Sequence, residues 1–486
     1  MAQTRSCEDV CLPVGSALGG RPKVRRVIAA GAFGLDNRWG CLCHGSMWCA
    51  EPAEGAGTQL QTDLPQPNVR PEVLGLRRKL IADRRHFHQH PEVSFDEHKT
   101  AAFCAQRLRD LGLKVETGVG TETGVVAFLT GELGEGPCIA LRADMDALPI
   151  QEEAAEGEEE LPFQSQNPGV SHACGHDAHM STMLCVAEVL SAQPFRSRLR
   201  GSIKFIFQPA EEQTDESRPY GGAFEMIEKG GVLDGVDSIY GMHVWSFSPT
   251  GIVGVSPGCV MAGCATLDID VEGRGGHGAA PQGTVDAVLV TGHLITALHS
   301  IVSRSHDPQS SVVLTIGSVE AGNPGAPNVI VQTSKLRGSA RFLDNQSEAI
   351  LKRRVEEVCE GVGKTFGAKV SLRWSKDSPP VINDVEAARH VEQAAKSIVS
   401  AAQTQRIATM ASEDFAYYLR DGAGGVPGST VPGVKGCFFF VGAAPKAEIA
   451  GKRPHHNPSF TIDEDAMLIA ASVFVQLIEN LLCQSQ

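Results

Sequence analysis

The segment from Ser171 to Met180 places one thiol, three imidazoles and one carboxylate within ten residues. Cys174 and His176 are separated by a single glycine, so both side chains can reach one point if the chain is extended or is turning into a helix. A thiolate and a neutral imidazole are ligands that zinc, manganese, nickel and iron accept. The alternative is a buried cysteine with surface histidines in a turn, but so many donors rarely cluster without use. The segment therefore predicts a metal site, and Asp177 is expected to cap the helix that follows.

Two acidic residues follow a strand-like segment upstream of this motif. The apolar run from Cys138 to Leu141 leads through Arg142 into Asp144 and Asp146. Open α/β sheets bind their ligands beyond the carboxyl ends of the strands. Asp144 and Asp146 are therefore metal ligands, groups that orient the ligands, or turn formers, and the residues alone favour none of the three.

A pair of neighbouring glutamates follows the next predicted strand. Residues 201–207 are dense in β-branched and aromatic side chains, and they end shortly before Glu211 and Glu212. Two exposed glutamates that open an acidic loop are one interpretation. The other is that one carboxylate binds a metal while its neighbour stays free as a general base. The residues alone leave both interpretations open.

Histidines complete the set of donors. His243 ends a predicted strand, where a histidine is usually a packed core residue, and a later turn carries both His455 and His456. Collected together, the strong donors are Cys174, His176, Glu212, His243 and one of His455 and His456. Five ligands are too many for one tetrahedral site but suit two adjacent ions with a shared bridging water. Two such ions acidify a water molecule and polarise a carbonyl, which is the chemistry of amide hydrolysis.

The hydrophobic pattern divides the chain into four segments. Residues 1–70, rich in Gly, Pro and Cys, are predicted to be a disordered or targeting extension. Residues 262–374 follow the order strand, helix, two strands, helix, strand, which predicts an inserted βαββαβ domain. Residues 71–261 and 375–486 are predicted to be the two parts of a catalytic domain. The chain therefore predicts an α/β fold of two domains.

Charge and cysteine usage exclude several classes of function. The net charge of −14 argues against nucleic acid or an anionic membrane as the main partner. No run of eighteen uncharged apolar residues occurs, so we predict no membrane span. The glycines of residues 273–278 lack the spacing of a nucleotide-binding loop. The 14 cysteines lack a paired spacing beyond the first fifty residues, which predicts free thiols in a reducing compartment such as the cytoplasm.

The chain resembles the amidohydrolase branch of the aminoacylase and carboxypeptidase superfamily of di-metal peptidases. This branch includes hippurate hydrolase, the plant indole-3-acetyl-amino acid hydrolases and bacterial N-acyl amino acid deacylases. The stretches that carry the resemblance span about residues 73–482 and stand in the family's order. They are residues 86–92, 141–150, 167–179, 208–212, 241–245, 275–281, 412–415 and 456–458.

The resemblance implies a di-metal exopeptidase-like α/β/α catalytic domain and an inserted lid that dimerises. It implies two divalent ions per subunit, with manganese favoured and zinc, cobalt or nickel as alternatives. It implies that Glu211 is the general base and that Cys174 bridges the ions. Asp144, Asp146 and Asp177 would orient the ligands, while His277 and Asn328 would bind an N-acyl amino acid substrate. The implied ligands are Cys174, His176, Glu212, His243 and His456.

Three departures from the family pattern concern the cleft. An insertion follows Glu212, the acidic loop of residues 152–160 is long, and the stretch of residues 328–331 has valine where many members have proline. Because the first two border the predicted cleft, they affect the choice of substrate and leave the ligand set intact.

Overall fold

A computed structural model of the protein describes residues 64–155, 161–212, 218, 220–419, 431–445 and 450–483. The predicted N-terminal extension lies outside the described residues up to residue 63. Most of the insertion after Glu212 and the second half of the acidic loop also lie outside them. The nine cysteines within the described ranges are all free, as their scattered spacing predicts.

A mixed sheet of eight strands forms the centre of the first domain, in the order β1-β2-β4-β3-β5-β16-β6-β15. The central strands β4, β3, β5 and β16 run parallel to one another, and β1 and β2 add an antiparallel edge. The strands are β1 Lys114–Thr117, β2 Val125–Thr130, β3 Cys138–Asp144, β4 Ser202–Gln208, β5 Ser238–Pro249, β6 Val253–Gly254, β15 Thr404–Gln405 and β16 Lys435–Ala444. Because β3, β4 and β5 are parallel neighbours, their carboxyl ends meet at one edge of the sheet.

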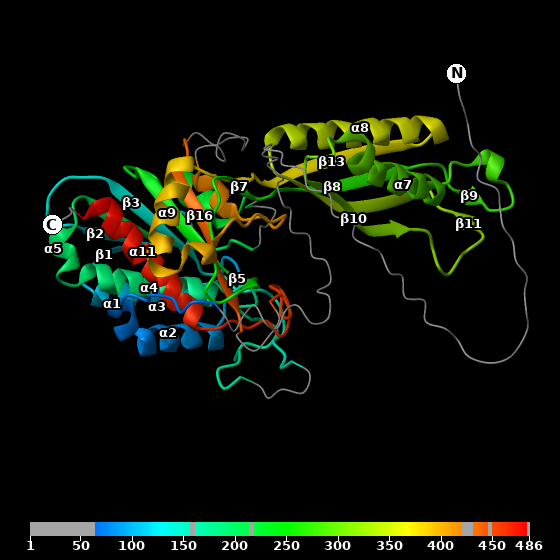
Figure 1. Ribbon diagram of the computed structural model, residues 1–486. Helices are drawn as coiled ribbons and strands as arrows, with labels where there is room; N and C mark the ends of the chain where they lie inside the picture. The colour runs from blue at the N-terminus through cyan, green and yellow to red at the C-terminus, as the bar shows by residue number, and fades with distance from the viewer. Residues whose placement is uncertain are drawn as a thin grey trace, which may run out of the picture. The chain divides into compact units, whose positions relative to one another are not determined.

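Helices cover both faces of this sheet (Figure 1). One face packs against α2, α3, α4, α9 and α11, and the other against α6 and the short helix η3. Strand β16 shows the resulting alternation, since Phe439 faces the first layer while Phe438 and Phe440 face the second. The helices are α1 Pro71–Gly75, α2 Arg77–Gln89, α3 His98–Asp110, α4 His176–Ser191, α5 Phe195–Arg198, α6 Gly221–Glu228, α9 Val385–Ile398, η2 Ala401–Gln403, η3 Asp414–Tyr418 and α11 Asp465–Leu482.

The second domain is a four-stranded antiparallel sheet in the order β10-β12-β8-β13, with helices α7 and α8 packed on it. Its strand and helix order is the predicted βαββαβ, so the predicted two-domain α/β fold is confirmed. Short strands β9 and β11 pair beside it. The elements are β8 Gly263–Glu272, β9 Gly276–His277, η1 Pro281–Gly283, α7 Ala287–Ser305, β10 Val312–Ala321, β11 Val329–Ile330, β12 Thr333–Phe342, α8 Asn345–Phe366 and β13 Lys369–Ser378.

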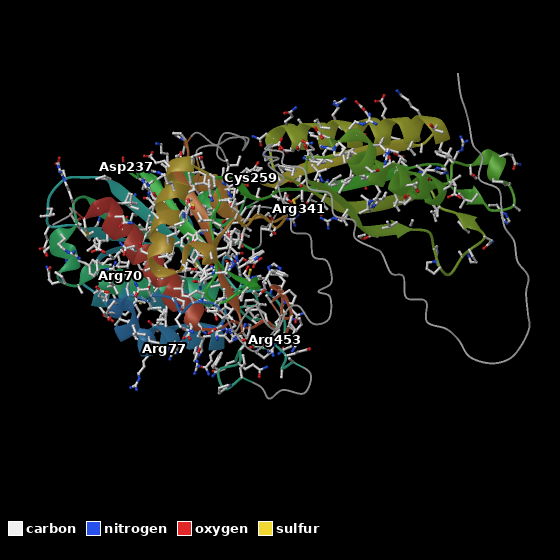
Figure 2. The ribbon with its side chains drawn as sticks, in the orientation of Figure 1. Arg70, Arg77, Asp237, Cys259, Arg341 and Arg453 are labelled. Atoms are coloured by element: carbon white, nitrogen blue, oxygen red, sulfur yellow. The ribbon has the colours of Figure 1, made fainter. Side chains whose placement is uncertain are left out.

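The chain enters and leaves the second domain through a pair of antiparallel strands, β7 Gly258–Met261 and β14 Val381–Asn383. Arg341, labelled in Figure 2, donates from Nη1 to Ser412 Oγ at 2.6 Å and so joins β12 to the segment before η3. Tyr417 in η3 donates its hydroxyl to the carbonyl of Asp377 at 2.7 Å. These bonds attach the inserted domain to Ser412, in the family stretch at residues 412–415, and to η3, which begins within that stretch.

Among the described residues, two helices are long and apolar enough to cross a membrane by length and composition alone, α7 and α11. In α11, 72% of the most apolar window is buried inside the protein, because the helix packs between α4, α9 and β16. Burial on that scale is what a core helix of the sheet requires.

Candidate metal centre

The predicted metal motif connects the end of a loop to the first turn of α4. Gly175 has φ of 92° there, and a Cβ atom on it would lie 2.5 Å from the side chain of Val244. Only glycine combines this positive φ with so close an approach to Val244. Cys174 and His176 therefore lie on either side of a left-handed turn that packs against β5. Asp177 lies inside the helix, whose N-cap is Gly175, and the predicted capping role of Asp177 is wrong.

The structure brings the predicted ligands together beyond the carboxyl ends of β3 and β4. His243 does not end its strand as predicted, because β5 continues to Pro249. The donor atoms of Cys174, Glu212 and His456 all lie within 4.8 Å of one another. Glu212 also forms such a group with His176 and Glu211, and Cys174 forms one with His243 and His455. Because the groups share Glu212 and Cys174, they join into one cluster. We use the name metal cluster for its members other than His455, which are Cys174, His176, Glu211, Glu212, His243 and His456.

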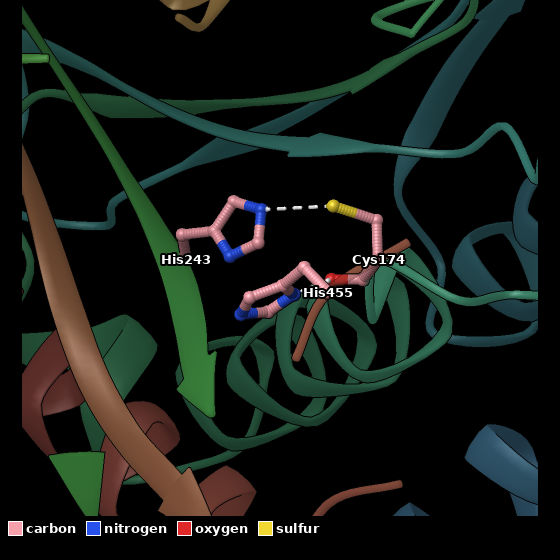
Figure 3. Close-up of side chains that lie close together, drawn as sticks. All are labelled: Cys174, His243 and His455. Carbon is pink, nitrogen blue, oxygen red and sulfur yellow. Dashed lines mark hydrogen bonds between the residues drawn. The ribbon is translucent and has the colours of Figure 1, made fainter. Parts of the chain in front are cut away.

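Two of the predicted histidine ligands have their ring nitrogens arranged for a cation. His243 places Nδ1 2.5 Å from the carbonyl oxygen of Val244, and His176 places Nδ1 2.8 Å from that of Asp146. A carbonyl only accepts, so each Nδ1 carries a proton and Nε2 is the nitrogen that each ring can offer to a cation. His243 Nε2 lies 3.5 Å from the sulfur of Cys174 (Figure 3).

Two neighbouring histidines are already engaged through both ring nitrogens. His455 Nε2 accepts from the amide of Ser246 at 3.2 Å, and its Nδ1 lies 3.2 Å from the carbonyl oxygen of Cys174. His179 Nε2 accepts from the amide of Val244 at 3.0 Å, and its Nδ1 lies 2.6 Å from Asp144. Neither ring has a lone pair left for a metal. Figure 3 shows the His455 ring beside Cys174 and His243, and this ring meets that of His243 edge to face with the centroids 5.0 Å apart.

His456 is the better donor of the two adjacent histidines. Its Nε2 lies 3.2 Å from Glu212 Oε1, and the residue is held at φ of 63°, which turns its ring away from that of His455. Half of the His456 side chain is exposed, so the ring closes the cluster from its open side. This geometry favours the ligand that the resemblance implies.

The unpaired atoms of the cluster suit cations. His176 Nε2 and Glu212 Oε1 are buried without a hydrogen-bond partner in the described structure. Buried polar atoms normally have partners, so these two point to a missing electropositive group. Burial holds the pKa of His243 well below its ordinary value, which keeps the imidazole in the neutral form that binds metal.

The electrostatic environment of the centre is strongly negative. Burial raises the pKa of the Cys174 thiol well above its usual range, and Glu212 and Glu211 raise it further. Burial, with the charges of Glu413 and Glu212, likewise raises the pKa of Glu211 well above its usual range. Bound cations would act in the opposite direction and permit a thiolate and a carboxylate here. The residues present therefore fit two divalent ions.

The two aspartates after β3 hold ligands in place. Asp146 accepts at Oδ2 from Ser94 Oγ at 2.6 Å and from the amide of Glu212 at 3.0 Å, and its carbonyl accepts from His176. Asp144 contacts His179 and lies 3.8 Å from His176 Nε2. Of the three roles that the sequence leaves open, these contacts favour orientation of the ligands.

A buried arginine on β3 supports the centre from behind, and sequence reasoning missed its role. Arg142 pairs with Asp144 at 2.7 Å and with Glu413 and Asp414 at 2.9 Å, and its Nε donates to Gln208 at 2.8 Å. Its side chain is 1% exposed. A charged residue at the end of an otherwise apolar strand was the available signal, since a buried guanidinium needs carboxylate partners.

Asp177 belongs to a different network. It pairs with Arg84 at 2.9 Å and with His88 Nδ1 at 2.7 Å, and His88 Nε2 lies 2.9 Å from Glu152. No bond connects the Asp177 side chain to the metal cluster among the described residues, so its predicted role in orienting ligands has no support here. Glu152, the first residue of the acidic loop, is buried in this network.

The two predicted substrate-binding residues lie together in the second domain. His277 and Val329 are paired in β9 and β11, and the carbonyl of Asn328 accepts from the amide of Gly278 at 2.7 Å. Within the described ranges, neither side chain bonds to a member of the metal cluster. His277 Nδ1 accepts from the amide of Ala279 at 3.0 Å, which leaves Nε2 as an exposed donor.

Residues 140–480 match the model of peptidase family M20/M25/M40. The chain is 40% identical over 409 residues to the putative amidohydrolase YhaA of Bacillus subtilis, covering 84% of this chain and 96% of that protein. It is 36% identical over 414 residues to hippurate hydrolase of Campylobacter jejuni, covering 84% and 98%. The crystal structure of Bacillus subtilis YXEP, described as a dinuclear metal binding peptidase from the M20 family, is 31% identical with a TM-score of 0.68. That match covers 84% of this chain and 99% of that one.

Proposed function

The chain belongs to peptidase family M20/M25/M40, and from this premise we propose that it is a metal-dependent amidohydrolase acting on N-acyl amino acids. The products are a carboxylic acid and a free amino acid. The observation that carries the proposal is the convergence of Cys174, Glu212 and His456 within 4.8 Å, with Glu211 beside them. The relatives named putative amidohydrolase and hippurate hydrolase support this substrate class.

The proposed metal ligands are Cys174, His176, Glu212, His243 and His456. Two divalent ions held there would polarise the amide carbonyl and acidify a water molecule. Manganese is the proposed metal by resemblance, with zinc next, because thiolate, imidazole and carboxylate donors together do not select one ion.

Glu211 is the proposed proton carrier. One of its oxygens accepts weakly from the amide of Asp414 at 3.4 Å, and Glu413 and Asp414 lie within 4.8 Å of it. Its carboxylate takes a proton from the attacking water, and the same proton then passes to the amide nitrogen as the C–N bond breaks.

We expect chelation to abolish this activity. Dialysis against a chelator should lower turnover by at least about a hundredfold, since water activation and carbonyl polarisation both depend on the ions. Adding back Mn²⁺, Zn²⁺, Co²⁺ or Ni²⁺ one at a time identifies the competent ion. The substrates are hippurate, indole-3-acetyl-alanine, N-acetyl amino acids and dipeptides. Fastest turnover of dipeptides would favour a dipeptidase, and no turnover in any reconstituted form would favour a non-catalytic metal-binding relative.

The proposed dimer forms through the second domain, and His277 acts in the site of the partner subunit. Four large apolar side chains are exposed on this domain, and the exposed fractions lie between 44% and 51%; they are Val288, Leu289, Val319 and Val329. The edge strand β10 leaves its outer backbone groups free for pairing in the described sheet. We further propose that the enzyme is cytoplasmic or reaches an organelle through residues 1–70.

Mixing two inactive variants tests the role of His277. A heterodimer of His277→Ala and Glu211→Gln subunits has one complete site only if His277 acts across the interface. Random mixing should then restore about a quarter of the parental activity. Size-exclusion chromatography with light scattering measures the dimer in parallel. Mixtures that stay inactive while heterodimers are present would assign His277 to its own subunit.

A further inference from the structure

We propose that Glu97 is a positioning residue for the metal centre, because its carboxylate holds in place the two backbone turns that deliver Glu211, Glu212 and Asp146. The proposal rests on the proposed function, since it concerns how the same centre is aligned. Glu97 lies outside the metal motif, immediately before α3, and neither the sequence pattern nor the ligand set indicates a role for it.

The Glu97 side chain is fully buried and accepts three hydrogen bonds. Oε1 accepts from the amide of Ala210 at 2.8 Å and from the amide of Phe95 at 2.9 Å. Oε2 accepts from Thr123 Oγ1 at 2.8 Å. No Lys, Arg or His of the described chain forms an ion pair with it. A carboxylate buried without a counter-charge is costly, so packing alone does not account for a glutamate here.

Two of its three donors are amides of residues in the left-handed region. Phe95 has φ of 67° and Ala210 has φ of 49°. Non-glycine residues rarely adopt this conformation and need surrounding contacts to keep it. Among the non-glycine residues of the described ranges, only His456 shares it, and His456 is itself a proposed ligand. One oxygen atom of Glu97 therefore fixes two of the three strained positions.

Each of these turns leads directly to the centre. Ala210 precedes Glu211 and Glu212, and the amide of Glu212 donates to Asp146 Oδ2 at 3.0 Å. The residue before Phe95 is Ser94, which donates to the same oxygen at 2.6 Å. Glu97 thus joins, through two backbone amides, the segment that carries the base and the segment that holds Asp146.

Capping of α3 does not account for the Glu97 carboxylate. Its side chain makes no capping bond to its own helix. Glu92 performs that task, because its Oε2 accepts from the amides of Lys99 and Thr100, each at 2.9 Å. The bonds of Glu97 are directed instead toward Ala210, 113 residues away in sequence.

Three substitutions of Glu97 distinguish the effect of its side-chain length from the effect of its charge. Glu97→Gln keeps the length and one acceptor oxygen for both amides, and its amide group can donate to Thr123, so we expect kcat close to the parent. Glu97→Asp keeps the charge but is one methylene shorter, and Glu97→Ala loses both. We expect each of these two to lower kcat by at least about tenfold with KM little changed, because a small displacement of a catalytic group is costly. Glutamine slower than aspartate would overturn the proposal.

A second substitution tests the mechanism at Ala210. Glycine adopts positive φ without strain, so Ala210→Gly should restore much of the kcat lost in Glu97→Ala while changing the parent little. If Ala210→Gly changed kcat by the same factor in the parent and in Glu97→Ala, the proposed coupling between Glu97 and Ala210 would be contradicted. Thr123→Val is the matched control: it removes the third bond of Glu97 without touching either turn, so we expect lower thermal stability with kcat retained.

Titration of the apo forms with Mn²⁺ provides a readout independent of turnover. Misplacement of Glu212 should weaken Mn²⁺ binding in Glu97→Asp by about tenfold or more and leave Glu97→Gln near the parent. If the parent hydrolyses no amide, the proposed function fails while this comparison still decides the role of Glu97. Equal Mn²⁺ affinity of the parent and of the Gln, Asp and Ala variants of Glu97 would reject the proposed role of Glu97.

Discussion

Glu211→Gln is expected to lower kcat by at least about a hundredfold while two divalent ions per subunit stay bound. Glutamine has the same size but cannot take a proton from water or deliver one to the leaving amine. Glu211 is not needed for the ligand set, because Cys174, Glu212 and His456 group without it. Steady-state kinetics on the best amide substrate and metal analysis of the same preparation measure both outcomes.

The control for this substitution is Glu153→Gln, an exposed glutamate in the nearby loop. It makes the same chemical change outside the centre, so parental kinetics are expected. Turnover of Glu211→Gln equal to that of the parent would end the assignment of Glu211 as base. Loss of both turnover and metal would show instead that Glu211 is a ligand, and the general base would then have to be sought elsewhere in the cluster.

Four of the five proposed metal donors can be predicted from sequence because each belongs to a local pattern. Cys174 and His176 share one motif, Glu212 follows a recognisable strand, and His243 lies within another. Parallel neighbouring strands bring such ends to one edge of a sheet, so local patterns and topology agree. The same reasoning predicts the two-domain α/β fold, whose elements alternate in the order that the structure shows.

The distinction between donor and supporting histidines cannot be predicted in this way. His455 and His456 are adjacent, and only the hydrogen bonds of their rings show which one has a free lone pair. Those bonds come from Ser246 and Cys174, which are remote in sequence. The wrong prediction for Asp177 has a similar cause, because its partner Arg84 lies on another helix and draws the carboxylate away from a cap.

Backbone conformation is a second feature that the residue pattern does not reveal. Ala210 is an ordinary small residue in sequence, yet it occupies the left-handed region because a buried carboxylate holds its amide. Glu97 is equally inconspicuous, since it stands among other polar residues before α3. Long-range bonds of this kind follow from the assembled fold and therefore require the structure.

Arg142→Met is expected to destabilise the protein by about 3–5 kcal/mol, because it leaves buried carboxylates without their cation. The guanidinium contacts Asp144, Glu413 and Asp414, and the four side chains are at most 7% exposed. Although burial alone would raise it, the charges of His176, His179 and Arg142 hold the pKa of Asp144 well below its usual range. Methionine fills similar space but supplies no charge, so electrostatics and not volume should dominate the loss.

Arg337→Met is the matched control for this prediction, since Arg337 forms an ion pair with Asp268 at the same 2.7 Å distance as Arg142 with Asp144. Arg337 is 68% exposed, and an exposed pair contributes at most about 1 kcal/mol. Urea unfolding of the apo forms measures the free energy of unfolding for both variants without a contribution from bound metal. Equal losses in the two variants would mean that the buried carboxylates are neutralised by protons and not by Arg142, and the centre would then need no fixed cation behind it.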